Sequence, residues 1–111
     1  MEPHGHHAKA RRLERSVEKL KAEADFEMII EGCYAASVQY IALICDRRRR
    51  RHLDTHKGLT KFLDEADLPD LAASFRELEL LRTSRYYGGQ TNGKAAKEAK
   101  RILAEIKTKL H

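Results

Sequence analysis

The chain has 111 residues, of which 41% are hydrophobic and 35% charged, and it carries a formal net charge of +5 at pH 7. This length suits one compact domain over residues 1–111 and is too short for two ordinary domains. The apolar fraction excludes disorder throughout, and a composition without Trp and with only four Tyr and three Phe leaves little material for a sheet. Composition therefore predicts a single all-α domain, with residues 1–7 flexible.

The net charge indicates the kind of partner, and the cysteines and the start of the chain indicate the cellular compartment. A basic balance, with a pI near 9.4, favours an anionic partner. Cys33 and Cys45 lie in an apolar helical pattern without Cys-x-x-Cys spacing, which predicts buried, reduced thiols rather than metal ligands or a disulfide. No signal-peptide pattern opens the chain, and two Glu interrupt its most apolar stretch. We therefore expect a cytoplasmic protein that has no membrane span.

Apolar residues recur at helical spacing in two segments before the arginine run. Residues 8–24 carry a single apolar stripe among Lys, Arg and Glu, which is typical of an amphipathic helix: Leu13, Val17, Leu20 and Ala24. Residues 25–46 are apolar on nearly all sides and predict the central, most buried helix. Ala35, Ala36 and Ser37 within it would allow a second helix, in this chain or in a second copy, to approach closely.

Three more helices are predicted after the arginine run. A short one covers about 55–66, and Asp67-Leu68-Pro69 ends it. The next begins at Pro69, which suits a first helical turn, and runs to about Tyr87, before a Gly-rich break. The last covers about 94–110. Because short loops place neighbouring helices antiparallel, the predicted fold is an up-and-down bundle of four main helices plus one short helix.

The strongest functional signal is a run of five arginines, Arg47 to Arg51, followed by His52 and His56. A guanidinium binds phosphate with two donors, and an imidazole titrates near neutral pH. The combination predicts nucleic-acid binding, with cleavage possible in chemical terms. A positive cluster at a helix end also suits the negative end of the helix dipole, so an inert surface loop is the competing interpretation.

Three stretches give the chain a family resemblance: Gly32-Cys33-Tyr34-Ala35-Ala36-Ser37, Thr55-His56-Lys57-Gly58 and Leu81-Arg82-Thr83-Ser84-Arg85-Tyr86-Tyr87-Gly88. Together with the helix that runs to Cys45, they resemble the small stand-alone HEPN domains over roughly residues 25 to 88. The resemblance implies a four-helix bundle, usually dimeric, whose Arg-x4-6-His motif cleaves RNA without metal. It also implies that some relatives act as toxins or as partners of minimal nucleotidyltransferases.

Several registers of that motif fit this sequence, since Arg47 can pair with His52, and Arg49, Arg50 or Arg51 with His56. The resemblance favours His56 with Arg51 and Arg50 as the catalytic set. The candidates for substrate binding are Arg47, Arg48, Arg49, His52, Lys57, Arg82, Arg85 and Tyr87. The last stretch departs from the family pattern, because Arg85 stands in place of a small residue and Tyr86 in place of an Asp, so this chain lacks the acidic residue of that pattern.

Cleavage through the 2′-hydroxyl needs a base, an acid and positive charge on the phosphorane. One His and one Arg supply half of this set, so a two-fold dimer would complete the site at its interface, with no metal or cofactor. The alternatives are a noncatalytic module that docks on a nucleotidyltransferase, and a plain RNA-binding helical protein. His4, His6 and His7 lack the carboxylates or thiols of a metal site.

Overall fold

The computed structural model describes residues 3–21, 24–49, 68–83 and 92–110, and these ranges form four helices and no strand. The helices are α1 (Pro3–Glu18), α2 (Phe26–Arg49), α4 (Pro69–Thr83) and α5 (Asn92–Thr108). The prediction of an all-α helical bundle is confirmed. The short helix predicted at about 55–66 lies outside the described residues.

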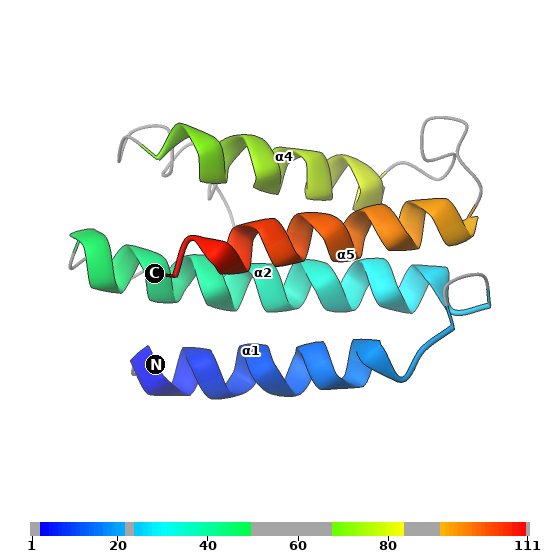
Figure 1. Cartoon of the computed structure of the whole chain (residues 1–111), viewed down its shortest axis with the longest axis horizontal. Coiled ribbons are helices and arrows are strands. Elements are labelled where there is room, and N and C mark those ends of the chain that lie inside the picture. Colours follow the sequence, from blue (N-terminus) through cyan, green and yellow to red (C-terminus); the bar gives the residue numbers. More distant parts are fainter. Residues whose placement is uncertain (1–2, 22–23, 50–67, 84–91, 111) are drawn as a thin grey trace.

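The four helices run alternately up and down, with α2 at the centre (Figure 1). α2 packs against each of α1, α4 and α5, whereas α1 packs chiefly against α2. α2 and α5 lie side by side and run in the same direction, and α1 and α4 run in the opposite one. As a result, the start of α1 and the ends of α2 and α5 all lie at one end of the bundle, which we call the basic end.

Helix α1 begins at Pro3, five residues before residue 8, where its apolar stripe predicts the start, and the flexibility expected of residues 1–7 stays a prediction. Proline suits the first helical position because its fixed φ is already helical. The side chain of His6 is buried, and its Nδ1 lies 2.7 Å from Oε1 of Gln39 on α2. This buried contact, together with buried Ala10 and Val17, extends the packed face of α1 to its first turns.

The connection from α1 to α2 ends in an acidic cap. The Asp25 carboxylate accepts a hydrogen bond from the Lys21 backbone N–H at 2.8 Å, and the Asp25 carbonyl accepts one from Ile29 at 2.9 Å. An acidic side chain at this position stabilises the positive end of the helix dipole. The predicted start of α2 at residue 25 is therefore correct to within one residue, whereas its end lies three residues later than predicted, at Arg49.

The core is built around α2, which is buried over most of its length as its all-round apolar pattern predicts. Its large buried side chains pack with those of α4 and α5: Ile29, Ile30, Ile41, Phe75, Leu78, Ile102 and Ile106. Each such burial stabilises the fold by about 1.5–3 kcal/mol relative to exposure. Cys33 and Cys45 are both buried, as their place in the apolar pattern predicts, and no disulfide joins them.

The same helix is long and apolar enough over Phe26–Cys45 to cross a membrane, the only such stretch in the described ranges. Its neighbours in the bundle bury 78% of it, and the core helix of a bundle meets this criterion as readily as a span does. The small residues that α2 offers for close approach are used largely inside the chain. Ala36 and Ser37 are fully buried, Ala35 is half-buried, and Gly32 faces Val17 of α1.

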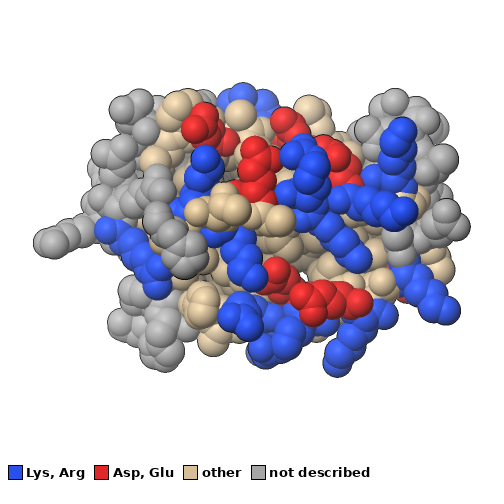
Figure 2. Space-filling model, in the orientation of Figure 1, with Lys and Arg blue, Asp and Glu red and all other residues tan. Residues whose placement is uncertain are grey.

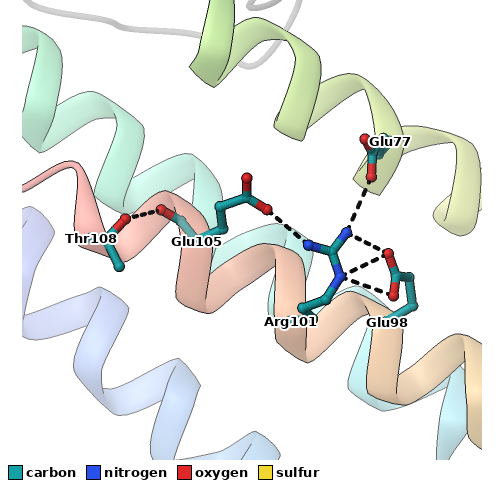
Figure 3. A network of polar contacts seen from close by, with 5 residues as sticks. All are labelled: Glu77, Glu98, Arg101, Glu105 and Thr108. Carbon is teal, nitrogen blue, oxygen red and sulfur yellow. Dashed lines mark hydrogen bonds and ion pairs between the residues drawn. The ribbon is translucent and has the colours of Figure 1, made fainter.

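Helices α4 and α5 are joined at the surface by a cluster around Arg101 (Figure 3). Its guanidinium donates to Glu98 at 3.0 Å, to Glu105 at 2.9 Å and, across the helix pair, to Glu77 at 3.5 Å. The hydrogen bond from Arg101 holds the pKa of Glu98 below its usual value. Because these groups are largely solvated, the cluster orients the two helices more than it stabilises them.

Candidate nucleic-acid interface

The arginine run begins while α2 is still helical. Arg47 is exposed on its last turn, and Arg48 and Arg49 continue the helical backbone. The Nη1 group of Arg47 donates to the backbone carbonyl of Leu110, just beyond α5, at 3.4 Å. Arginines here complement the negative end of the α2 dipole, and Arg47 also caps a carbonyl of a neighbouring helix end. The run therefore starts on the last turn of α2, at the basic end of the bundle.

Two lysines at the end of α5 lie near carboxylates, whereas Arg47 has no carboxylate partner among the described side chains. Lys107 Nζ lies 3.2 Å from Glu14 Oε1, and Lys109 Nζ lies 4.0 Å from the Asp70 carboxylate. The one polar contact that the described residues make with the Arg47 guanidinium is the neutral carbonyl of Leu110. An exposed guanidinium with an uncompensated charge is suited to phosphate, which it can bind through two parallel hydrogen bonds.

Arg82, a predicted substrate-binding residue, lies near the opposite end of the bundle and links α4 to α2. Its Nε donates to both carboxylate oxygens of Glu31 at 2.9 and 3.1 Å, and its guanidinium carbon lies 4.2 Å from the Tyr34 ring centroid. Tyr34 in turn packs on Phe75 with 5.2 Å between ring centroids. Because Glu31 balances the charge of Arg82, this geometry gives Arg82 a structural role, and its substrate contact stays a prediction.

The remaining predicted site residues lie outside the described residues. They are the catalytic set Arg50, Arg51 and His56 and the substrate-binding candidates His52, Lys57, Arg85 and Tyr87. For Arg48 and Arg49 the structure describes only the helical backbone. Of the predicted site, the structure therefore places the side chains of Arg47 and Arg82, and it puts them at opposite ends of the bundle (Figure 1).

A polar cluster that sequence reasoning missed joins α1, α2 and α5 inside the bundle. The fully buried Tyr40 donates its hydroxyl to Glu14 at 2.6 Å, and Lys107 Nζ approaches both oxygens of Glu14 at 3.2 Å. The His7 ring lies edge-on to Tyr40, with 6.4 Å between centroids. Burial, and next the hydrogen bond to Glu14, raise the pKa of Tyr40, so its hydroxyl remains protonated. The cluster therefore acts as a structural donor network, not as a source of base or nucleophile.

The buried thiols also lack the features of reactive groups. Burial raises the pKa of Cys33 to about 12, whereas a nucleophilic or metal-binding cysteine needs an accessible thiolate. In the described ranges, no three His, Cys, Asp or Glu side chains come together as metal ligands. The chemistry that these ranges offer is thus cationic surface rather than a metal or thiol centre.

Comparison of the chain with known protein families, curated proteins and solved structures finds no match. The resemblance to HEPN domains therefore depends on the three short stretches of sequence and on the motif register, while the fold supports the coarser class of helical bundle. What the described geometry adds to that resemblance is one exposed, uncompensated arginine at the start of the motif.

Proposed function

We propose that this protein binds single-stranded RNA through its phosphates, at the basic end of the bundle where α2 leaves the core. The observation that carries the proposal is Arg47, which is exposed, helical and without a carboxylate partner among the described side chains. The sequence continues from it with four further arginines. Several arginines close together in the sequence favour a chain of phosphates over a single small anion.

Metal-independent cleavage of the bound RNA is the finer proposal, and it rests on the HEPN resemblance. His56 would move the proton of the 2′-hydroxyl or of the departing 5′ oxygen, and Arg50 and Arg51 would stabilise the charge that develops on phosphorus. Because one chain offers half of the required acid and base set, the proposal includes a homodimer whose two copies complete one site.

Binding is tested by fluorescence anisotropy with a labelled oligouridylate at several salt concentrations. Each phosphate contact contributes about 0.7 to the slope of log affinity against log salt for single strands. Arg47→Gln should lower that slope by about 0.7, so between about 50 and 200 mM salt the affinity of the parent falls about 2.6-fold more than that of the variant. The matched control is Lys97→Gln, which removes an exposed charge from the first half of α5, away from the basic end. This variant should leave the slope unchanged.

Cleavage is tested separately, in excess chelator, with the parent and His56→Ala at equal RNA occupancy. Loss of cleavage in His56→Ala with binding retained supports the catalytic proposal. Binding without cleavage by the parent leaves the RNA-binding protein and refutes the nuclease. RNA affinity that does not vary with salt refutes the binding proposal itself.

A further inference from the structure

The two flanks of α1 carry opposite charge. On the flank that faces α5, Glu14 and Glu18 border a cavity of about 140 Å³, together with Val17, Lys100 and Leu103. The Glu14 carboxylate accepts hydrogen bonds from the Tyr40 hydroxyl and from Lys107 Nζ. The acids of α1 are therefore turned toward α5 and are partly neutralised by it. In Figure 2, Lys and Arg side chains gather along the edge that α1 forms, beneath a row of carboxylates.

The other flank is purely cationic over the residues that the structure describes. Lys9, Arg12 and Arg15 line an open groove of about 590 Å³, together with Gly5 and Ala8. Spacings of three and four residues place all five on one face of the helix. No described carboxylate lines this groove or pairs with the three cations. The groove therefore has an uncompensated charge of three, in addition to that of Arg47.

The shape of the groove suits a chain of anions. From Gly5 to Arg15 it extends about 15 Å along the helix, at about 1.5 Å per residue, which exceeds the size of one phosphate. Gly5 and Ala8 have little or no side chain, so a ligand backbone can approach the helix closely. The first turn of α1 holds no acidic residue, and the positive end of its dipole lies beside Gly5.

The position of the groove connects it to the end of α2. α1 starts at the basic end of the bundle, where Arg47 lies, and runs away from it (Figure 1). A single strand bound at Arg47 can thus continue along α1. A membrane surface fits less well, because a lipid-binding helix needs apolar side chains beside its cations, and the apolar residues Ala10 and Val17 of α1 are buried against α2.

We propose that this groove is a second phosphate-binding surface, which guides single-stranded RNA along α1 from the basic end of the bundle. The ligand class rests on the function proposed above, whereas the residues and the surface are separate from the arginine run. The binding footprint therefore covers two elements, α1 and the end of α2, that lie far apart in the sequence.

The test compares two variants that remove the same charge, one from the groove along α1 and one from the end of the bundle opposite the basic end. The first replaces the groove cations as Lys9→Gln, Arg12→Gln and Arg15→Gln. The control replaces three exposed lysines of the opposite end as Lys21→Gln, Lys94→Gln and Lys97→Gln. Both are measured by anisotropy with a labelled oligouridylate over about 50–200 mM salt. Circular dichroism and urea unfolding establish that each variant is folded.

At about 0.7 per contact, the groove variant should lose about 2.1 from the salt slope. Over that fourfold rise in salt, the affinity of the parent then falls about 18-fold more than that of the groove variant. The control should keep the slope of the parent, and the charge-retaining variant Lys9→Arg, Arg12→Lys and Arg15→Lys should restore it. Equal slopes in the groove variant and the parent overturn the proposal.

The outcomes separate this proposal from the one on which it rests. If Arg47→Gln lowers the slope and the groove variant does not, RNA binding stands and the groove is refuted. If the groove variant alone lowers it, the groove stands and the site at Arg47 is refuted. A third assay pellets the proteins with vesicles of anionic phospholipid. Vesicle binding that the groove variant abolishes, with RNA binding unchanged, assigns the groove to membranes and overturns the proposal.

Discussion

Helices α1 and α2 lie close together where Gly32 faces Val17. From this contact we predict that Gly32→Ala lowers the free energy of unfolding, and that a second substitution, at Val17, reverses the sign of that effect. A Cβ atom added to Gly32 would overlap Cγ2 of Val17. Gly32→Ala should therefore incur an overpacking cost of about 1–3 kcal/mol. Alanine gains about 1 kcal/mol over glycine in the interior of a helix. The net expectation is a loss of about 1 kcal/mol in the free energy of unfolding.

In a Val17→Ala background the obstructing methyl group is absent, so the same change should stabilise the protein by about 1 kcal/mol. Urea unfolding of the parent, both single variants and the double variant measures this cycle. Ala73→Gly, at an exposed position of α4, is the control and should cost about 1 kcal/mol in both backgrounds. A stabilising effect of Gly32→Ala in both backgrounds would show that the two helices do not meet closely here.

Two further predictions concern the buried groups of α2. Because burial raises the pKa of Cys33 from 9.0 to about 12, the folded protein keeps a proton that the unfolded chain loses in this interval. The resulting stability is complete below pH 9 and should decline by about 1.4 kcal/mol per pH unit as pH rises toward 12. Cys33→Ala should remove that part of the decline in urea titrations at increasing pH, and an unchanged slope would contradict the burial of the thiol. Tyr40→Phe removes the hydroxyl that donates to Glu14 and should cost about 1.5–3 kcal/mol. A much smaller cost in a Glu14→Gln background, measured by the same unfolding assay, would identify that hydrogen bond as the cause, and equal costs would exclude it.

The helices of this protein are predictable from sequence because their apolar spacing is regular, and the errors occur where polar residues take part in packing. His6 lies four residues before Ala10 and therefore on the apolar face of α1. From sequence alone, however, a histidine near a terminus is expected to be exposed to solvent. Its contact with Gln39 joins residues 33 positions apart, and no local pattern encodes that pairing. The same reason explains why the donor network of Tyr40 and Glu14 was not predicted.

The predicted site is harder to derive, because a charged residue binds a ligand only if the fold leaves its charge uncompensated. Arg82 and Arg47 look alike in sequence, but Arg82 meets Glu31 across the bundle and Arg47 meets only a carbonyl. For α1, the sequence shows cations and acids on one helix. Only the position of α5 shows that Glu14 and Glu18 face that helix. The same position leaves Lys9, Arg12 and Arg15 on the other flank of α1.

The burial of α2 determines where function can lie. A helix whose sides are occupied by three neighbours can present polar side chains to a ligand only at its ends, and the proposed phosphate-binding arginine Arg47 lies on the last turn of α2. The peripheral helix α1 packs chiefly on α2 and keeps one flank open. Because α1 and α2 are antiparallel, α1 starts at the end of the bundle where α2 ends (Figure 1). The close contact between Gly32 of α2 and Val17 of α1 helps to fix the spacing of these two helices, and therefore of the two proposed phosphate-binding surfaces. If both surfaces bind one RNA strand, a variant that loosens this contact should weaken binding to a strand that spans both surfaces more than binding to a short strand that reaches only one.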